Sequence, residues 1–468
     1  MICARSKKQR RCRIPKDCET GLPYTQIIHN GRRENLCTKI SLENLNIHSR
    51  LYLPLSSEII HKVKILRYFP KIIEIASKNI SLPSFYLPSI EYNVDHLSIE
   101  NMIIGGGISG LSLLENLNET ILISDSLNDD IFFDPLSDKN IVEKIKGIIK
   151  EKKDKIINGL FLGKFDEGYL IKTEDTLFIV NAKNIIFANG SRYIPPLFKN
   201  NDIPGIISRR MYLRNYKSIG KVMVIGSSDD ALKTAIIAKS KVLYKKGTNM
   251  FSKKWINIAE KEGIDIIGAD KINVKRKGKE LHINFDGIEE KINAIVYAIV
   301  KQPRLEAISN SNIDYIFYSF SHIYLPTHDI NGKAKDNIYV IGGSRAISDY
   351  ETSFLSAKII IDEKYIDEFR KKINENESHL IHFYSKNWET RTSPYIFGDK
   401  GYFCECEDVT FSDVANEKRK GYKTVEDIKR TTGACTGECQ GKICSYLLGS
   451  YLESEKLITF RSPLYPLW

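Results

Sequence analysis

The alternation of hydrophobic and polar positions predicts two strand–turn–helix units in the middle of the chain. The segment IENMIIGGGISGLSLLENL (99–117) begins with an apolar strand that ends at Ile104, passes through a glycine-rich turn and continues with leucines at helical spacing. The segment KVMVIGSSDDALKTAII (221–237) repeats the same order of elements. Strands that alternate with helices favour a parallel sheet, so we expect an α/β core.

Three further segments complete this pattern. NAKNIIFANGSRYIPP (181–196) reads as a strand that ends in a turn at Gly190. AIVYAIVKQPRLE (294–306) reads as the end of the second unit, and DNIYVIGGSRAISDYETSFLSAKIII (336–361) as a return to the first. The expected order is therefore a first domain, an inserted second domain, and the first domain again.

The first turn, Gly105-x-Gly107-x-x-Gly110, has the spacing of a dinucleotide-binding loop. Gly105 permits a tight turn, Gly107 lets the backbone approach a diphosphate, and Gly110 lets the helix pack closely on the strand. The helix N-terminus then presents N–H groups and a positive dipole end to the phosphates. The next strand, TILIS, leads into Asp125, where a carboxylate would meet ribose hydroxyls. The set predicts a dinucleotide site; the alternative is a glycine turn of purely structural use.

The order of these segments resembles the two-dinucleotide-domain flavoproteins of the glutathione-reductase type, over residues 99–361. The resemblance implies that the first domain binds FAD or another ADP-containing nucleotide. The contacts that it implies come from Gly105, Gly107, Gly110, Asp125, Gly190 and Gly342.

Two departures from that family pattern matter. In the second loop, Ser228 replaces the glycine that admits a diphosphate, which argues against tight NAD(P) binding, although Lys245 and Lys246 would suit a phosphate. At the return to the first domain, Gly342-Gly343 stands where the family has Gly-Asp. The ADP half of the first site is therefore better supported than the flavin half.

The C-terminal segment 403–444 predicts a compact helical module. Thr410-x-x-Asp413 and Thr424-x-x-Asp427 are acidic variants of the capping box and could each start a short helix. Gly421 and Gly433 are placed to end these helices. Cysteines stand before the helix pair and directly after it, so two short helices would bring them together.

The nine cysteines lie at the two ends of the chain: four in the first 37 residues and five in the last 65. A secreted disulfide protein of this size would also have disulfides in its middle. Thiolates bind zinc or iron–sulfur clusters, and Cys404-x-Cys406 is tighter than the usual zinc pair. The residues favour a cluster and leave zinc and free thiols as alternatives.

The motif C-E-C-E-D-V-T, followed about thirty residues later by G-E-C-Q-G-K-I-C, resembles the small [2Fe–2S] module related to bacterioferritin-associated ferredoxin. It takes the form found in the alpha subunits of heterotetrameric sarcosine oxidase, dye-linked proline and hydroxyproline dehydrogenases, and hydrogen cyanide synthase. The resemblance implies Cys404, Cys406, Cys439 and Cys444 as ligands. Cys435 stands where the family has glycine, as an alternative fourth ligand or a spare thiol.

The N-terminal segment resembles a degenerate plant-type ferredoxin loop. Residues 28–37, which end in Cys37, are similar to the closing part of such a loop, whereas Cys12 and Cys18 are out of register. The arm RSKKQRRCRIPK (5–16) holds seven basic residues of a chain whose net charge is +11. Metal binding here stays open, and nucleic-acid binding by the arm has no supporting motif.

We therefore expect two dinucleotide-binding-like domains, a helical [2Fe–2S] domain and a degenerate ferredoxin-like segment. The predicted boundaries are 1–45 for the ferredoxin-like basic segment, 46–98 for a linker, 99–219 for the first part of the FAD/ADP-binding domain, 220–308 for the second nucleotide-binding-like domain, 309–375 for the return to the first, and 376–468 for the helical [2Fe–2S] domain.

The resemblance implies an electron-transfer flavoprotein and iron–sulfur subunit of a heteromeric amino-acid or secondary-amine dehydrogenase, an FAD-dependent oxidoreductase acting on CH–NH donors. A flavoprotein beta subunit would carry the substrate site, with a small ferredoxin-like subunit as a further partner. No catalytic residue is assigned, since His379 and His382 read as structural. The sequence has no signal peptide and no apolar run long enough to span a membrane, so we expect a cytoplasmic protein. The alternatives are a stand-alone NAD(P)H-dependent flavoprotein reductase and a zinc-bearing interaction or nucleic-acid-binding protein.

Overall fold

The computed structural model of the chain describes residues 26–29, 32–35 and 91–465, apart from residues 128, 204, 279 and 438. Near the N-terminus it gives the backbone of an antiparallel hairpin formed by β1 (Gln26–His29) and β2 (Arg32–Asn35). The cysteines and the basic arm of the predicted ferredoxin-like segment lie outside the described residues, as does most of the predicted linker.

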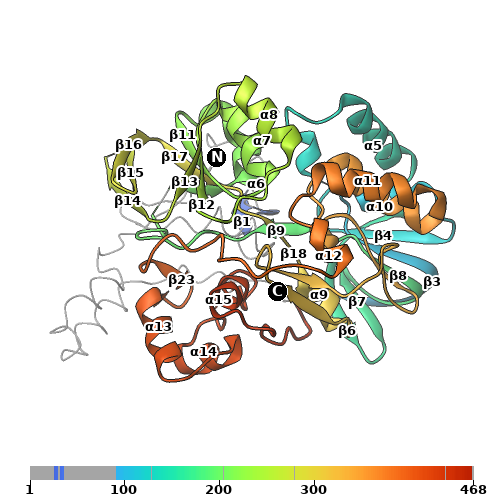
Figure 1. The fold of residues 1–468 in the computed structure, drawn as a ribbon. Helices are drawn as coiled ribbons and strands as arrows, with labels where there is room; N and C mark the ends of the chain where they lie inside the picture. Colours follow the sequence, from blue (N-terminus) through green and yellow to red (C-terminus); the bar gives the residue numbers. More distant parts are fainter. Residues whose placement is uncertain are drawn as a thin grey trace.

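An eight-stranded sheet forms the first nucleotide-type domain (Figure 1). Its central strand, β3 (Asn93–Ile104), begins ahead of the predicted boundary at residue 99 and runs parallel to both of its neighbours. Six strands lie in the order β21 (Lys333–Lys335), β22 (Ile338–Val340), β8 (Thr176–Phe187), β3, β4 (Thr120–Ser124) and β5 (Ile156–Asn158). The other two form an antiparallel extension, in which β7 (Gly168–Lys172) pairs with β8 and β6 (Leu160–Phe165) pairs with β7.

The late strand β22 shows that the chain returns to the first sheet after an insertion. It pairs in parallel with β8, with Ile338 opposite Ile185. Helices α4 (Ile108–Leu114) and α10 (Tyr350–Ile361) share one buried apolar cluster with β3 and β4, which includes Leu111 and Leu122. Helix α5 (Lys139–Glu151) joins the same cluster, and α11 (Ile366–Asn376) packs on α10.

The inserted domain contains a five-stranded parallel sheet. Its order is β10 (Ile206–Ser208), β17 (Ala294–Tyr297), β11 (Val222–Ile225), β12 (Val242–Lys245) and β13 (Ile266–Ala269). Its helices are α6 (Arg209–Asn215), α7 (Asp229–Ala238) and α8 (Lys253–Lys261), and β14 (Ile272–Lys277), β15 (Glu280–Phe285) and β16 (Ile288–Ile292) form an antiparallel sheet beside it. The predicted fold class, α/β with two nucleotide-type domains, is confirmed.

Two short antiparallel strands link the domains: β9 (Ser191–Tyr193) enters the insertion and β18 (Lys301–Pro303) leaves it. The chain then forms α9 (Leu305–Asn310), the pair β19 (Tyr315–Tyr318) and β20 (Ile323–Pro326), and, after α11, α12 (Ile381–Ser385). Short 3-10 turns also occur among the described residues of both domains: η4 (Asp130–Phe132), η5 (Lys153–Lys155), η6 (Tyr216–Ser218), η7 (Gly342–Arg345) and η8 (Glu363–Tyr365).

The C-terminal module is helical, as predicted. Its elements are β23 (Tyr402–Cys404), β24 (Val409–Thr410), α13 (Phe411–Arg419), α14 (Val425–Thr432) and α15 (Cys444–Leu452). Thr410 and Thr424 each form the predicted capping box with the aspartate three residues on. Gly433 ends α14 with a φ of 78°, and Gly421, with a φ of 100°, follows the end of α13.

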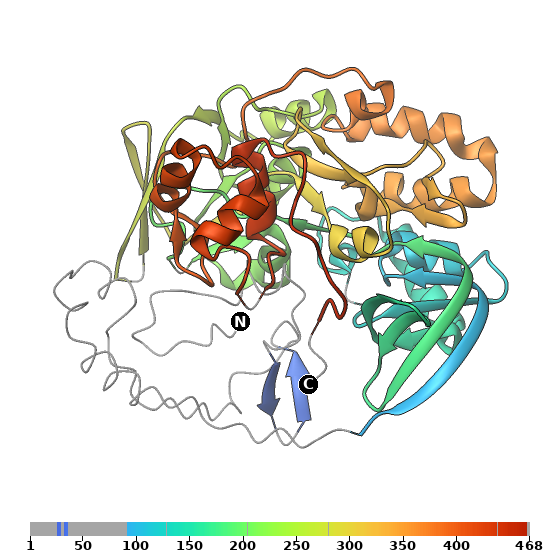
Figure 2. The same cartoon turned by 90° about the horizontal axis from the view of Figure 1, so that it is seen from below.

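The module packs on the core through aromatic side chains. The ring of Tyr446 on α15 lies 6.1 Å from that of Tyr324 on β20. In Figure 2 the module (red) lies against the second domain (green) on one side and the region of β20 (gold) on the other. Within the described part of the chain, no helix has the length and apolar character needed to cross a membrane.

Candidate functional site

Five cysteines meet in the C-terminal module because the two capped helices fold the chain back on itself. Cys404 ends β23 and Cys406 follows in the next turn. Cys435 and Cys439 lie in the loop after α14, and Cys444 begins α15. All are free thiols, and all except the half-buried Cys406 are buried.

Four of the thiols form a closed ring of contacts. Cys404 interacts through its sulfur with Cys406 and Cys444. Cys439 completes the ring, because it interacts with the same two partners. The thiol of Cys435 lies outside this ring, and its sulfur is 3.4 Å from that of Cys444. The ring consists of the four cysteines that the sequence motif names as ligands.

Backbone N–H groups point at three of these sulfur atoms. The amide of Cys435 donates to the sulfur of Cys404, and the amide of Cys439 donates to that of Cys406. The amide of Ile443 donates to the sulfur of Cys439. Hydrogen bonds to sulfur are among the features by which proteins hold and tune iron–sulfur clusters.

The thiols strongly affect one another's acidity. Hydrogen bonding to Cys406, then to Cys444, and then burial raise the pKa of Cys404. The contact with Cys406 lowers the pKa of Cys439, but Cys444 and burial outweigh it and raise the value to about 12. Without a cation these thiols stay protonated, and a metal would reverse this by binding the thiolates.

Four thiolates in pairs are a donor set that suits a cluster of two irons. Among the described side chains, no three His, Cys, Asp or Glu residues are arranged to hold a single metal ion. A [2Fe–2S] cluster divides four thiolates between two irons, so each iron needs only a pair. A four-membered ring of thiols meets that requirement, and the donor set therefore fits such a cluster.

The conformation of the cysteine loop explains its glycines. Cys435 has a φ of 68°, a left-handed backbone conformation that favours glycine, the residue found there in the resembling family. Gly437 lies so close to the first cysteine pair that a Cβ atom on it would be 2.4 Å from the Cβ of Cys406. The loop can fold over Cys406 only because this position has no side chain.

The first glycine loop has the close packing that its sequence predicts. A Cβ atom at Gly105, whose φ is 119°, would lie 2.2 Å from the carbonyl oxygen of Ala188. A Cβ atom at Gly110 would lie 2.1 Å from the carbonyl oxygen of Gly105. These two glycines let β3, β8 and α4 approach one another.

The diphosphate position of this loop is occupied by a side chain that the sequence analysis missed. The N–H of Ile108 donates to Oδ2 of Asp129 at 2.9 Å, and a Cβ atom at Gly107 would meet the same oxygen at 2.7 Å. The other oxygen of Asp129 accepts the N–H of Ile131 at 3.2 Å. Burial, then the neighbouring Asp130, raise the pKa of Asp129. The chain thus supplies its own anion where a phosphate would bind.

The other predicted nucleotide residues lie around the same edge of the sheet. The side chain of Asp125 is exposed, yet the surrounding protein raises its pKa by desolvation, against the opposing effect of Arg304. Gly343 approaches the turn at Gly190, where a Cβ atom on it would be 3.0 Å from the Cα. The N–H of Gly342 donates to Oγ of Ser356 at 2.9 Å, so this amide is already bonded.

The second loop is covered by a later segment of its own domain. The N–H of Met250 donates to the carbonyl oxygen of Ser227 at 2.8 Å, and the N–H of Ser252 donates to Oδ1 of Asp229 at 2.7 Å. Ser228 is buried, and its hydroxyl has no partner. A dinucleotide would have to displace this segment, which agrees with the expectation of weak NAD(P) binding.

The lysines that seemed suited to a phosphate are engaged elsewhere. Lys245 pairs with Asp270 at 3.0 Å, and Lys246 pairs with Asp286 at 2.9 Å. These pairs join the end of β12 to Asp270, just before β14, and to Asp286, just after β15. They therefore read as structural contacts.

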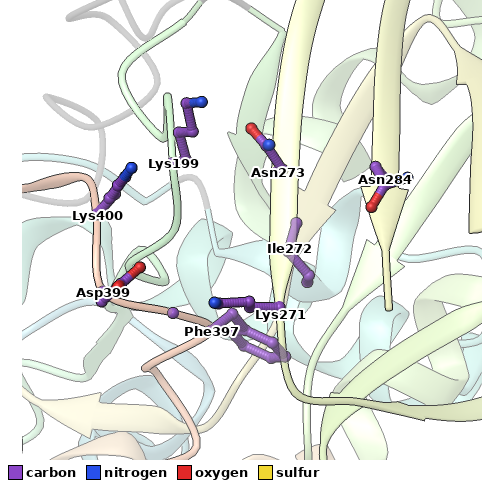
Figure 3. A pocket seen from close by; sticks show the side chains of 9 residues that line it. Lys199, Lys271, Ile272, Asn273, Asn284, Phe397, Asp399 and Lys400 are labelled. Carbon is purple, nitrogen blue, oxygen red and sulfur yellow. The ribbon is translucent and has the colours of Figure 1, made fainter. Parts of the chain in front are cut away.

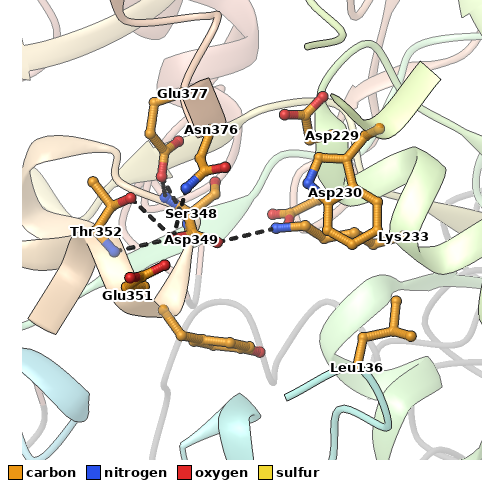
Figure 4. Close-up of polar contacts among 12 residues, drawn as sticks. Leu136, Asp229, Asp230, Lys233, Ser348, Asp349, Glu351, Thr352, Asn376 and Glu377 are labelled. Atoms are coloured by element: carbon orange, nitrogen blue, oxygen red, sulfur yellow. Dashed lines mark hydrogen bonds and ion pairs between the residues drawn. The ribbon is translucent and has the colours of Figure 1, made fainter. Parts of the chain in front are cut away.

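A buried set of charges holds the two nucleotide-type domains together (Figure 4). Lys233 on α7 lies 3.8 Å from Asp349 at the start of α10, and Lys301 lies 3.7 Å from Asp230. Glu377 accepts the backbone N–H of Asp349 at 2.7 Å, and burial raises its pKa well above the usual value. The pair of Lys233 and Asp349 joins the inserted domain to the first domain.

The two neighbouring histidines are structural, as expected. His379 is buried and its Nε2 lies 2.9 Å from the carbonyl oxygen of Ala346. His382 packs edge-on against the ring of Phe320, with 4.9 Å between ring centroids. Neither lies at the cysteine ring or at a glycine loop.

A separate pocket of about 210 Å³ lies between β14 and the segment that leads into the C-terminal module. Figure 3 shows side chains from three segments around it, among them Lys199, Asn273 and Asp399. Its charged side chains are exposed, and it shares no residue with the cysteine ring or with either glycine loop. The pocket has no evident part in the chemistry of those sites.

Comparison with known proteins agrees with this geometry at the C-terminus. Residues 402–454 match the family of BFD-like [2Fe-2S] binding domains. The matched residues include the four cysteines of the ring and also Cys435. The C-terminal module is therefore a [2Fe–2S] binding domain. No curated protein matches the sequence.

The fold is also similar to solved structures. The crystal structure of L-proline dehydrogenase from P. horikoshii is similar with a TM-score of 0.57 and 21% sequence identity, over 81% of this chain and 80% of that chain. Thioredoxin reductase from T. acidophilum is similar over 58% of this chain and 99% of that chain, at 14% identity and a TM-score of 0.44. The first likeness supports the overall fold of this chain.

Proposed function

We propose that this chain is the electron-transfer subunit of a heteromeric dehydrogenase that oxidises an amino acid or a secondary amine. The observation that carries the proposal is the ring formed by Cys404, Cys406, Cys439 and Cys444 inside a [2Fe–2S] binding domain. A cluster held there would accept and release one electron at a time. The fold similarity to a proline dehydrogenase makes proline the first substrate to test, followed by hydroxyproline and sarcosine.

The substrate is oxidised, in this proposal, on a partner flavoprotein subunit. At the first loop, Asp129 bonds the amides of Ile108 and Ile131, and His379 is bonded to the carbonyl oxygen of Ala346. The chain's own first domain would hold FAD or another ADP-containing nucleotide along Gly105, Gly107 and Asp125, once Asp129 has moved aside. Such a nucleotide, if FAD, would supply a two-electron carrier beside the one-electron cluster.

The covered second loop argues against the alternative of a stand-alone NAD(P)H-dependent reductase. That activity needs an open dinucleotide loop, and the segment around Met250 and Ser252 covers it. A hydride donor would therefore have no place to bind in the inserted domain. Electrons would instead reach the chain from a partner protein.

The test is the composition and spectrum of the full chain purified without oxygen. We expect two irons and two sulfides per chain, a visible absorption that bleaches with dithionite, and an EPR signal from the reduced state. The chain alone should not reduce a dye with proline, and it should do so when co-expressed with its substrate-oxidising subunit. A colourless protein that contains zinc, or rapid bleaching by NADH, would contradict the proposal.

A further inference from the structure

A buried charged bridge joins the cysteine loop to the strand that links the two nucleotide-type domains. Arg192 on β9, two residues after Gly190, is fully buried. Its guanidinium donates to the backbone carbonyl of Lys442 and forms an ion pair with Glu306. Lys442 stands between Cys439 and Cys444 in the sequence, so this bridge ends inside the cysteine loop.

The side chain of Lys442 is held in one place. It is only 2% exposed, and its Nζ donates to the carbonyl oxygen of Leu464 at 2.8 Å. The same ammonium group lies over the ring of Tyr465, 4.8 Å from the centroid. Burial is the largest effect and lowers the pKa of Lys442, and Glu306 and the sulfur of Cys439 oppose that shift. The ammonium group is therefore held in place within the cysteine loop, between two predicted cluster ligands in the sequence.

The bridge carries a net positive charge in a dry environment. Arg192 and Lys442 are two buried cations, and Glu306 pairs with Arg192 and acts electrostatically on Lys442. Arg304 adds a further cation nearby, since it acts electrostatically on both Arg192 and Glu306. Charges that are removed from water interact more strongly and are screened less by salt than surface charges are.

We propose that Lys442 and Arg192 raise the reduction potential of the cluster and so direct electrons from the nucleotide side of the molecule towards it. The inference rests on the proposed function. Reduction adds one electron, and hence one negative charge, to the cluster, and a fixed cation stabilises that form over the oxidised form. Net charge around a cluster is one of the determinants of its potential. Lys442 and Arg192 therefore act on the cluster through their charge and are not ligands.

Because the bridge holds both a cation and an anion, the inference predicts shifts of the reduction potential in opposite directions when each is removed. Lys442→Met removes a cation, so it should favour the oxidised cluster. Glu306→Gln removes the anion, so it should favour the reduced cluster. Simple damage to the packing would not move the potential in opposite directions in the two variants.

The experiment is an EPR-monitored potentiometric titration of the full chain with its cluster in place. We expect Lys442→Met to lower the ratio of reduced to oxidised cluster about tenfold at a given potential, a shift of about 59 mV for one electron. Glu306→Gln should shift the midpoint in the opposite direction. Lys442→Arg should keep the wild-type midpoint, and Lys420→Met, which removes an exposed cation from α13, should shift it little.

The outcomes separate the two proposals. A wild-type chain without iron or an EPR signal would refute the proposed function. A wild-type chain with a normal signal, but with Lys442→Met and Glu306→Gln unchanged or shifted in the same direction, would overturn the inference alone. If Lys442→Met does not retain iron, the sign of the shift in Glu306→Gln decides.

Discussion

The two nucleotide-type loops differ from the cysteine module in whether the chain itself supplies partners for the groups that would bind a ligand. In both loops the chain satisfies the binding groups from within, through Asp129 in the first and through the segment around Ser252 in the second. In the module, buried thiols gather close together, and the net effect of their contacts and burial raises the pKa values of Cys404 and Cys439.

The difference indicates where the molecule requires a ligand. A helix N-terminus that already binds a carboxylate gains little from a phosphate, because the phosphate must first displace that carboxylate. Clustered thiols gain much from a metal, because the metal removes their mutual repulsion as thiolates. We therefore expect the glycine loops of the flavoprotein-type core to bind a ligand less strongly than the cysteine module does.

The largest expected effect is loss of the cluster on changing a ring cysteine. Cys439→Ser should lower iron and sulfide to near zero, because it breaks the four-membered ring of thiols. Cys435→Ser is the matched control, since it changes a buried cysteine of the same loop that lies outside the ring. Iron and sulfide analysis with the visible spectrum measures both. Loss of iron in Cys435→Ser would show that the ring has been assigned incorrectly.

The second prediction concerns the closed second loop. Burial raises the pKa of Asp229 to about 6, so the folded chain loses stability as pH rises from about 4 to about 6 and stays less stable above that. Asp229→Asn, which keeps an acceptor for Ser252, should therefore add about 2–3 kcal/mol to the free energy of unfolding at pH 8 and little at pH 4.

Denaturant unfolding at the two pH values measures this difference. Asp270→Asn is the control: its carboxylate is exposed and its pKa is lowered by hydrogen bonds from Lys245 and Lys246, so its loss should not stabilise the chain at pH 8. Equal gains for Asp229→Asn at both pH values would contradict the buried-charge explanation.

The third prediction opens the first loop. Asp129→Ala removes the carboxylate from the N–H of Ile108, so ADP and FAD should bind about tenfold more tightly, or about 1.4 kcal/mol. Isothermal titration calorimetry measures the dissociation constants. Asp138→Ala is the matched control, because it removes another helix-capping aspartate, whose side chain bonds the first amides of α5. Unchanged affinity in Asp129→Ala would mean that this carboxylate does not compete with a nucleotide.

The smallest expected effect tests how the module depends on its metal. Thr424→Ala removes the hydroxyl that caps α14 and should cost about 1 kcal/mol in the metal-free module. The loss should shrink when the cluster is present, because the metal ties both ends of the module together. Thr431→Ala, within the same helix, is the control and should cost less. Thermal unfolding with and without iron checks this, and equal losses in both states would show that the cluster does not support the helix.

Local rules account for what the sequence predicts correctly. Gly105 and Gly110 are required by close backbone contacts, and such contacts follow from the spacing of the motif. The capping boxes at Thr410 and Thr424 depend on residues three positions apart. These rules act over a few residues, so a single sequence is enough to apply them.

The features that the sequence does not reveal depend on contacts between distant segments. Asp129 reaches Ile108 across 21 positions, and nothing in the spacing of its loop signals that contact. Arg192 meets Lys442 across 250 positions. Such pairs are fixed by how domains pack, and a single sequence carries no record of that packing.

The position of Cys435 has a consequence for maturation of the protein. Its thiol lies 3.4 Å from that of Cys444, so the metal-free chain holds a pair of cysteines that an oxidant such as oxidised glutathione can join. Joining them would remove a ring member before iron and sulfide arrive. Assembly of the centre must therefore precede oxidation, and a cell that makes this protein has to deliver iron to a reduced chain.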